Sequence, residues 1–236
     1  MNESKAKSNL LEIKNKLEEN EVNYWLDAGT LLAAARDGRF IPWDNDIDLG
    51  TWEESCEKLI ELKNDFERLG YKVKYNTFII SLEKDECPIN VSIYKREKDF
   101  AVRRSFYKYS QIRLINSFMI RLAFLMRSSY YHKLSLRHSD EIVTKIAIIF
   151  SKIRHRMPDS IKQRLDIKHE KISTKQICIV DSKHFNSSEF LTFYDNMYPV
   201  PHDYKAYLVA RYGKDWQTPI KDWVTERDDQ SVVIES

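Results

Sequence analysis

The chain has few of the residues that make tight turns or covalent crosslinks. Its 236 residues include 5 glycines, 6 prolines and 3 cysteines. So few turn-forming residues favour long helices and strands. Cys56, Cys87 and Cys178 lie far apart without a Cys-x-x-Cys pair. This spacing argues against a disulfide framework or a structural zinc site and favours a reducing compartment.

Long apolar runs and a strong net charge are also missing. The longest apolar passages, residues 115–126 and 142–153, are interrupted by Arg121 and Lys145 and are too short to span a bilayer. No apolar signal-peptide core is visible near the start. The formal net charge of +2 gives no reason to expect nucleic acid as a partner. We therefore expect a cytoplasmic protein, either soluble or peripherally bound to a membrane.

One segment departs from this balance of charges. Residues 103–168 are rich in Lys and Arg and contain only four acidic residues. Apolar residues at helical spacing predict helices there, and aromatic residues lie among the arginines. Such a face is usually no more than solvated surface, but an anionic glycan or a membrane surface would also suit it.

What the sequence does contain is three carboxylates on alternate positions. Asp44, Asp46 and Asp48 follow shortly after Gly29 and Thr30. In an extended segment the three would project from one face, where like charges repel one another. A divalent cation removes that repulsion, and Mg²⁺ accepts carboxylates while leaving positions open for phosphate. The pattern predicts metal-assisted chemistry on a phosphate.

Local patterns around these carboxylates predict alternating strands and helices. Residues 24–26 read as a strand, and a Gly-Thr turn then leads into a short helix, residues 31–36, whose N-terminal amides face an anion. Residues 47–50 form the strand that carries the Asp-x-Asp pair. Thr51 and Glu54 have the spacing of a capping box that opens the next helix.

Periodicity also predicts the elements further along the chain. A first helix ends near Asn20, and residues 71–82 and 89–94 form a pair of strands. Residues 177–180 form another strand, and a terminal helix covers residues 203–212, closed by a glycine.

The Gly-Thr turn, short helix and Asp-x-Asp strand have the arrangement of the nucleotidyltransferase fold. The fuller pattern Gly29-Thr-Leu-Leu, Ala35-Arg36 and Phe40-Ile-Pro-Trp-Asp-x-Asp-Ile-Asp48 resembles the LicD family, which includes bacterial phosphocholine transferases and fukutin-related proteins. A second block, residues 198–208 and 211–216, is similar to that family's C-terminal signature. The two blocks together cover about a fifth of the chain.

The resemblance implies an α/β (α+β) protein with a nucleotidyltransferase-like mixed sheet. Residues 1–100 would form the core that carries the Asp-x-Asp motif. Residues 101–170 would be a basic helical insertion, and residues 171–236 would complete the core with the terminal helix.

The resemblance also implies a reaction. An alcohol phosphate, such as phosphocholine or ribitol phosphate, would move from a CDP-linked donor to a hydroxyl of a cell-surface glycan or a lipid-linked precursor, with CMP leaving. Asp46 and Asp48 would be catalytic and would hold Mg²⁺, with Mn²⁺ as an alternative. The basic segment 103–168 would meet the glycan acceptor or a membrane surface.

The donor-binding residues follow from the same motif. Gly29 and Thr30 would cradle the donor phosphate, with Arg36 and Asp44 beside them in the substrate site. A surface position for Arg36 is an equally good interpretation. Asp27 is more simply a helix or turn cap than a base.

Three positions depart from the family pattern. Ala33 replaces a usual glycine, Asp37 a usual histidine, and Ser92 a third Asp that serves as a further metal ligand or as the base. Two alternative functions therefore stay open. One is a nucleotidyltransferase that moves NMP from an NTP, and the other is a catalytically inactive relative that binds glycan or a membrane. For Tyr204, Tyr207 and Tyr212, core packing is favoured over a role as substrate platforms.

Overall fold

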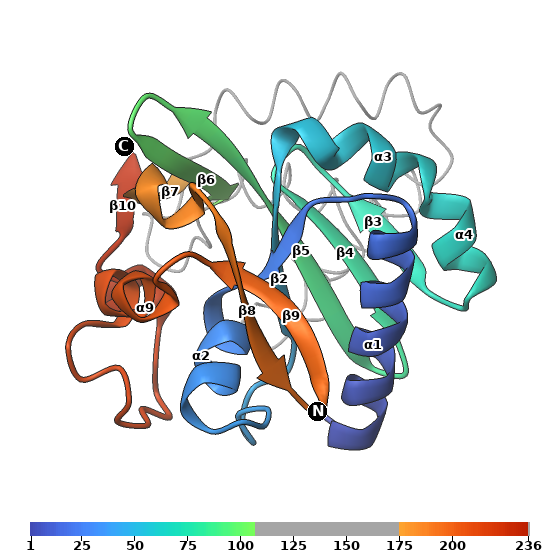
Figure 1. Ribbon diagram of the computed structural model, residues 1–236, viewed down its shortest axis with the longest axis horizontal. Coiled ribbons are helices and arrows are strands. Elements are labelled where there is room, and N and C mark those ends of the chain that lie inside the picture. Colours follow the sequence, from blue (N-terminus) through green and yellow to red (C-terminus); the bar gives the residue numbers. More distant parts are fainter. Residues whose placement is uncertain (107–174, 236) are drawn as a thin grey trace, which may run out of the picture. The chain divides into compact units, whose positions relative to one another are not determined.

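The computed structural model describes residues 1–106 and 175–235. Met1–Ser105 and Gln176–Glu235 form one compact unit, a mixed α/β structure around one large sheet (Figure 1). Nearly all of the predicted basic helical insertion lies outside the described residues. Among the described residues, no helix combines the length and the apolar character needed to cross a membrane.

The main sheet contains eight strands of the described chain. They are β1 (Tyr24–Leu26), β2 (Ile47–Trp52), β3 (Lys72–Tyr75), β4 (Ile79–Lys84), β5 (Cys87–Glu97), β6 (Phe100–Phe106), β7 (Lys175–Asp181) and β10 (Val232–Glu235). Their order is β1-β2-β5-β6-β7-β10, with β4 also paired to β5, and β3 to β4. The sheet is mixed, because β2 runs parallel to β5 while β1, β4 and β6 run antiparallel to their neighbours.

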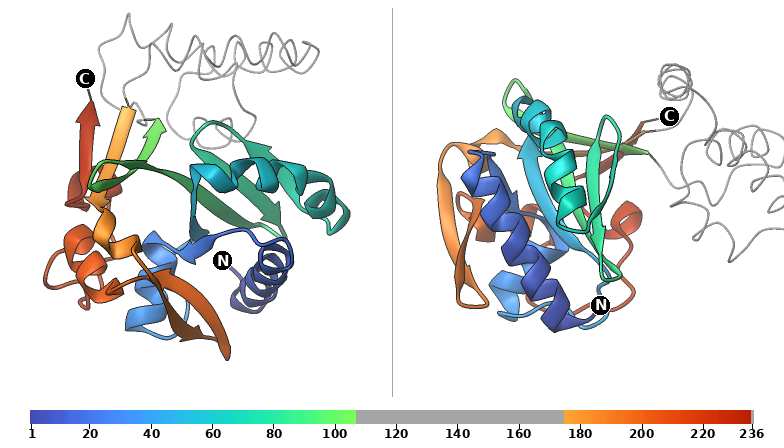
Figure 2. Two further views of the ribbon diagram at one scale, coloured as in Figure 1. Left: turned by 45° about the horizontal axis from the view of Figure 1, so that its top comes forward. Right: turned by 90° about the vertical axis from the view of Figure 1, so that its right-hand side faces the viewer.

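Helices and a small hairpin complete the described unit. The helices are α1 (Glu3–Glu19), α2 (Ala28–Arg36), α3 (Cys56–Glu61), α4 (Lys63–Arg68), α9 (Tyr204–Tyr212) and α10 (Thr225–Asp228). The hairpin consists of β8 (Ser188–Phe193) and β9 (Asn196–Pro201). Figure 2 shows α1 and this hairpin on the same side of the main sheet.

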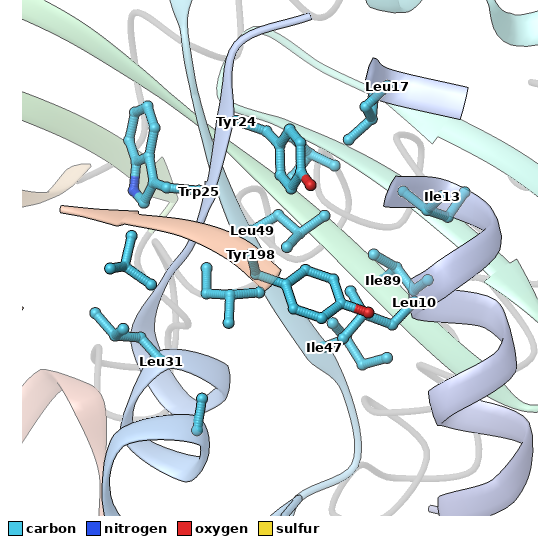
Figure 3. Close-up of a cluster of buried hydrophobic side chains, with 14 of the residues drawn as sticks. Leu10, Ile13, Leu17, Tyr24, Trp25, Leu31, Ile47, Leu49, Ile89 and Tyr198 are labelled. Carbon is cyan, nitrogen blue, oxygen red and sulfur yellow. The ribbon is translucent and has the colours of Figure 1, made fainter. Parts of the chain in front are cut away.

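One face of the two central strands forms the apolar core. Ile47 pairs with Ile89 and Leu49 with Val91 across the parallel β2 and β5, and all four side chains are buried. Helix α1 and the hairpin cover this face through Leu10, Ile13, Leu17 and Tyr198 (Figure 3). Burial of this apolar area is the main favourable term for the fold.

The other face of the same strands is polar. Side chains alternate across a strand, so the register that pairs Asp48 with Asn90 puts both on this face. Ser92 and Tyr94 follow on β5 at intervals of two, and Arg103 on β6 pairs with Tyr94. Polar groups that are distant in sequence are thereby placed in one row.

Several predicted elements are confirmed with small shifts in their ends. Helix α1 ends at Glu19, and β1 and β7 are present. Helix α9 begins after Asp203, whose side chain accepts a hydrogen bond from the Ala206 amide, and it closes at Gly213 with φ of 83°. Gly213 is suited to this position because the left-handed region strains other residues.

Residues 71–82, predicted as one strand, instead form the two antiparallel strands β3 and β4. The chain turns between them at Asn76, whose side-chain oxygen accepts a hydrogen bond from the Phe78 amide over 2.8 Å. This local bond offers the backbone an alternative to an extended strand. The prediction missed it because the flanking β-branched and aromatic residues dominate the pattern.

The predicted capping box at Thr51 is wrong. Thr51 lies within β2, and its hydroxyl donates to the Asn23 carbonyl over 2.6 Å. The turn that follows, Glu53–Ser55, has no side-chain cap. Pairing with β1 and β5 carries β2 past the predicted end, so sheet hydrogen bonds outweigh the local capping pattern.

Two local predictions near the acidic motif are also wrong. Gly29 and Thr30 form no separate turn, because α2 already begins at Ala28. The strand begins at Ile47 as predicted, but it carries only Asp48, so the predicted placement of Asp46 on it is wrong. The β6 strand belongs to the core sheet, although its residues from position 101 onward fall in the stretch that the sequence assigned to the insertion.

Candidate active site

A cavity of about 370 Å³ lies beside the start of β2 and the first turn of α2. Its lining comes from α2, from the segment before β2, from β6, and from the C-terminal stretch between residues 211 and 225. Residues of both motif blocks, the acidic block and the C-terminal block, therefore line the same cavity.

All three predicted acidic residues line this cavity. Asp46 stands immediately before β2, and its carboxylate accepts a hydrogen bond from Asn90 Nδ2 over 2.8 Å. Asp48 is the second residue of β2, and its carboxylate faces the Gly29 amide over 3.3 Å. Asp44 approaches from the preceding loop. The segment thus gathers the carboxylates at one place even though it is not extended throughout.

The protein environment disfavours the ionised forms of two of these carboxylates. Burial, with a further contribution from Asp44, raises the pKa of Asp46 to about 6. Burial also raises the pKa of Asp48 well above its usual range, and Asp46 and Asp44 add to that shift. Arg103 opposes it with its positive charge. A divalent cation bound here would favour the ionised forms by the same electrostatics.

These donors fit an open magnesium site better than a closed metal centre. Within residues 1–106 and 175–235, no three His, Cys, Asp or Glu side chains are arranged to enclose a metal. Mg²⁺, however, is usually bound through one or two carboxylates, with water and substrate phosphates completing its shell. Asp46 and Asp48 supply two carboxylates at the edge of a cavity that has room for those other ligands.

A glycine is required where α2 approaches the carboxylates. A Cβ atom at position 29 would lie 2.6 Å from Asp44 Oδ2 and 3.5 Å from Asp48 Oδ2. The first distance is shorter than real contacts allow, so any side chain would displace the Asp44 carboxylate. Gly29 therefore acts through close approach of the backbone.

Of the two remaining predicted site residues, Arg36 lines the cavity and Thr30 does not. The Arg36 guanidinium makes a double hydrogen bond to Asp37 over 3.0 and 2.7 Å. Thr30 is buried, and its hydroxyl accepts a hydrogen bond from the Asp48 amide over 2.8 Å. Thr30 contacts the backbone of β2 and does not line the cavity.

Several cavity residues had no role in the sequence predictions. Arg103 enters from β6, and Asp215, Trp216 and Trp223 come from the C-terminal stretch. The rings of Tyr212 and Trp223 lie 4.8 Å apart, which gives the cavity an aromatic wall. The C-terminal signature contains Tyr212, Asp215 and Trp216, so their position was signalled, whereas Arg103 and Trp223 lie outside both motif blocks.

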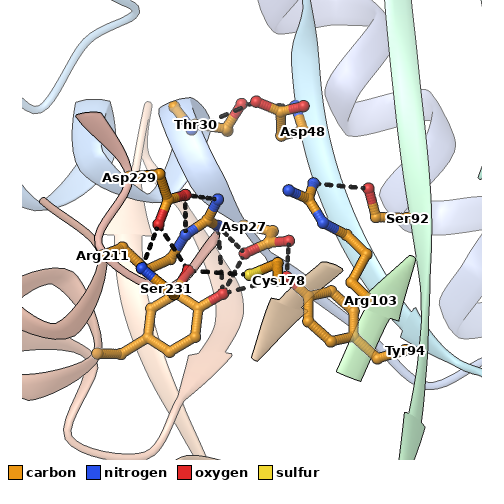
Figure 4. Close-up of polar contacts among 12 residues, drawn as sticks. Asp27, Thr30, Asp48, Ser92, Tyr94, Arg103, Cys178, Arg211, Asp229 and Ser231 are labelled. Carbon is orange, nitrogen blue, oxygen red and sulfur yellow. Dashed lines mark hydrogen bonds and ion pairs between the residues drawn. The ribbon is translucent and has the colours of Figure 1, made fainter. Parts of the chain in front are cut away.

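A buried polar cluster surrounds Asp27 (Figure 4). One of its members, Arg211, also lines the cavity. Asp27 occupies the N-cap position of α2 but makes no side-chain cap there. Its carboxylate accepts hydrogen bonds from the Tyr94 hydroxyl over 2.8 Å, the Tyr207 hydroxyl over 2.6 Å and Arg211 Nη1 over 3.1 Å. Arg211 also binds Asp229 over 2.7 Å.

The predicted cap at Asp27 is therefore replaced by a buried ion pair. The reason is tertiary, because three partners from distant elements satisfy the carboxylate before the helix amides do. Tyr207 belongs to this buried cluster, as the packing interpretation predicted, whereas Tyr212 is half-buried and lines the cavity.

Comparison with known proteins identifies the family. The model of the LicD/FKTN/FKRP nucleotidyltransferase domain matches residues 21–146, which is just over half of the chain. The chain belongs to this family. The matched region contains the whole acidic motif and the α2 helix before it.

Individual members of the LicD/FKTN/FKRP family match over shorter stretches. An uncharacterized protein of Rickettsia typhi is 32% identical over 93 residues, which are 39% of this chain and 29% of that protein. Ribitol 5-phosphate transferase FKRP of Homo sapiens is 54% identical over 46 residues, which are 18% of this chain and 9% of FKRP. The chain thus spans less than a third of the length of these relatives.

Solved structures of antibiotic-modifying enzymes are similar at low identity. The antibiotic-resistance factor ANT(2'')-Ia matches with a TM-score of 0.33 and 14% identity, covering 69% of this chain and 90% of that one. The lincosamide antibiotic adenylyltransferase LnuA matches with a TM-score of 0.32 and 17% identity, covering 58% of this chain and 93% of that one.

Proposed function

We propose that this chain transfers an alcohol phosphate from a CDP-linked donor to a hydroxyl of a glycan or a lipid-linked precursor. The observation that carries the proposal is the pair Asp46 and Asp48 at the edge of the cavity, in a chain of the LicD/FKTN/FKRP family. The short stretch similar to a ribitol 5-phosphate transferase supports an alcohol phosphate as the group that moves.

The proposed reaction is a displacement at phosphorus. The acceptor oxygen bonds to the phosphorus that carries the alcohol, the bond from that phosphorus to the bridging oxygen breaks, and CMP leaves with the electron pair. The proton of the acceptor hydroxyl is released to solvent. Positioning and electrostatic stabilisation supply most of the catalysis in such transfers.

The carboxylates would be the metal ligands of the site. Mg²⁺ bound by Asp46 and Asp48 would neutralise charge on the donor's pyrophosphate and on the departing CMP. Asn90 holds one oxygen of Asp46, and the Thr30 hydroxyl fixes the backbone of Asp48. Both contacts limit the motion of the ligands and so favour a fixed geometry.

Other cavity residues have complementary roles in the proposal. Gly29 lets the start of α2 approach the donor phosphate, and Arg36 adds a positive charge at the end of that helix. The wall formed by Tyr212, Trp216 and Trp223 offers flat apolar surface to a base or an alcohol group. The basic segment 103–168, in the same proposal, meets the acceptor or a membrane surface.

A donor screen tests the proposal directly. The purified chain is incubated with Mg²⁺ and with CDP-ribitol, CDP-glycerol or CDP-choline, and CMP release is measured by chromatography. Asp48→Asn serves as the inactive variant. Asp85→Asn is the matched control, since Asp85 is an exposed carboxylate that pairs with Lys5 in the part of the chain that the structure describes. CMP release by the wild type and by Asp85→Asn, but not by Asp48→Asn, is the expected result.

Two other outcomes would replace the proposal with its alternatives. Pyrophosphate release from an NTP, without CMP release from any CDP-alcohol, would assign nucleotidyl transfer to the same site. Binding of a CDP-alcohol by calorimetry with no release in either assay, even with added glycan acceptors, would indicate an inactive relative.

A further inference from the structure

Arg103 is a cation inside the acidic cavity. It lies on β6 opposite Tyr94, on the polar face of the sheet, and it lines the same cavity as Asp46 and Asp48. Figure 4 shows its guanidinium directed into the space beside Asp48, with Ser92 at its side. An arginine guanidinium stays charged at every pH that a protein survives.

The guanidinium of Arg103 has far fewer partners than it has donors. Nη1 donates to Ser92 Oγ over 3.3 Å, a long contact, and Nε is buried without a hydrogen-bond partner. No carboxylate of the described residues forms an ion pair with Arg103. A partly buried arginine with most of its five N–H groups unused is costly unless a ligand completes its bonding.

The two other arginines that line the cavity differ in this respect. Arg36 is paired with Asp37 through two hydrogen bonds. Arg211 is fully engaged, with Asp27 on one side and Asp229 on the other. Its charge is already balanced within the fold. Arg103 is therefore the cavity arginine, among the described residues, whose charge and donors stay open to an incoming anion.

The residue at position 92 keeps Arg103 available. Ser92 lies within hydrogen-bond distance of the guanidinium. An Asp at this position, which is the residue of the family pattern, would be placed to form an ion pair with Arg103. Such a pair would consume the positive charge and two of its donors. A serine instead orients the guanidinium without forming an ion pair with it.

We propose that Arg103 is a phosphate-binding residue of the cavity, with Ser92 as its positioning residue. The guanidinium takes an oxygen of the donor's pyrophosphate on the side away from the carboxylates. The ligand then bridges the metal side of the cavity, at Asp46 and Asp48, and the arginine side. That the phosphate belongs to a CDP-linked donor rests on the proposed function, but the anion site itself does not.

Binding of inorganic pyrophosphate in the presence of Mg²⁺, measured by calorimetry, tests the site without a donor. Arg103→Gln is expected to weaken binding about 10- to 100-fold, which is the range for hydrogen bonds to charged groups. Arg103→Lys is expected to recover part of the loss, because a lysine restores the charge but not the planar fork.

Arg104→Gln is the matched control. Arg104 neighbours Arg103 on β6 but projects from the opposite face, where it binds Glu97 over 2.7 and 3.1 Å. Its removal takes away one positive charge from the same strand, but that charge is already paired with Glu97 on the other side of the sheet. Pyrophosphate affinity within about twofold of the wild type is therefore expected. Thermal unfolding curves of each variant verify that it is folded.

Ser92→Asp gives a second test that keeps Arg103 in place. The new carboxylate is expected to pair with Arg103 and to weaken pyrophosphate binding by at least 10-fold. In the double variant Ser92→Asp with Arg103→Gln, the two losses should not add, because both remove the same cation. A tighter binding of pyrophosphate by Ser92→Asp would instead mean that position 92 serves the metal.

The outcomes separate this inference from the proposed function. Wild-type affinity in Arg103→Gln, or absence of pyrophosphate binding by the wild type, overturns the role of Arg103. Pyrophosphate binding that depends on Arg103, together with no CMP release from any CDP-alcohol, upholds the anion site and rejects the proposed donor.

Discussion

Arg211 donates a hydrogen bond from Nη1 to Asp27 Oδ1 over 3.1 Å, across 184 positions of the sequence. Asp27 immediately precedes α2 and Arg211 lies in α9, so this contact fixes the C-terminal helix α9 against the start of α2. Burial alone would raise the pKa of Asp27, but the charges of Arg211 and Arg103 and the hydroxyl of Tyr207 hold it below its usual range. The buried carboxylate is therefore ionised and fully bonded.

We expect Arg211→Met to lower the free energy of unfolding by about 3–5 kcal/mol, the range for removing one partner of a buried ion pair. The substitution leaves Asp27 and Asp229 buried without their cation. Urea denaturation measures the loss. Arg104→Gln removes a partly exposed pair with Glu97 and should change stability by no more than about 1 kcal/mol. Equal effects of the two variants would contradict the structural role of Arg211.

Asp46→Asn and Asp48→Asn are each expected to abolish turnover and to leave the fold intact. Burial and mutual repulsion raise the pKa of both carboxylates, which means that their charges destabilise the metal-free fold. An amide of the same shape relieves that repulsion, so the unfolding free energy without Mg²⁺ should be unchanged or higher. Activity assays at saturating Mg²⁺ test the loss of turnover, and urea denaturation tests the effect on the unfolding free energy. Near-normal turnover in either variant would refute the metal assignment.

Gly29→Ala should impair donor binding, whereas Gly50→Ala should lower stability. A Cβ at position 29 meets the movable end of Asp44, at 2.6 Å, so we expect loss of donor binding with little change in stability. A Cβ at position 50 lies 2.3 Å from the Trp25 ring, which is wedged between Trp52 and other aromatic rings. Overpacking there should lower stability by about 1–3 kcal/mol. Calorimetric titration and thermal melts distinguish the two outcomes.

His184 should make stability fall in mild acid. Its side chain is buried against the edge of the Tyr207 ring, and Nδ1 has no hydrogen-bond partner. Burial, with the nearby charge of Lys183, lowers its pKa from the ordinary 6.5 and outweighs the opposing effects of a hydrogen bond with the His202 backbone and of the Asp181 and Asp203 charges. The unfolded chain therefore binds a proton at a higher pH than the folded one. The contribution of neutral His184 to the unfolding free energy is therefore complete above about pH 6.5, and it is lost as the pH falls through the pKa of His184 in the folded protein.

Unfolding free energies at pH 7.5 and pH 5.5 measure this effect. His184→Gln should flatten the decline between the two values. His202→Gln is the matched control, since His202 is about half exposed and pairs with Glu189, and it should preserve the slope of the wild type. A slope unchanged by His184→Gln would assign the acid sensitivity to other groups.

The acidic motif was predictable because it depends on near neighbours. Asp44, Asp46 and Asp48 lie within five residues of one another, so any compact path of that segment brings them close, and the cavity contains all three. Gly29 and Arg36 were predictable as members of the same short stretch. The local details were less secure, since the Gly-Thr turn became part of a helix once α2 extended back to Ala28.

Arg103 and the partners of Asp27 could not be predicted in this way. Arg103 reaches the cavity only because β6 pairs with β5 in the register that places it opposite Tyr94. No local pattern gives that register, because a shift of one residue would turn the side chain to the opposite face. Asp27 likewise read as a cap, since its hydrogen-bond partners lie 67 to 184 residues away.

The sequence by itself determined the family, the order of most strands and helices, and the set of carboxylates for the candidate metal site. These follow from short-range periodicity and from residues that stand next to one another. The tertiary structure decided which polar groups meet: Asp27 with Arg211, Ser92 with Arg103, and the C-terminal aromatics with the acidic segment. The physical reason is that strand pairing and helix packing bring distant residues within hydrogen-bond distance, and the energy of burying them selects partners that no local pattern encodes.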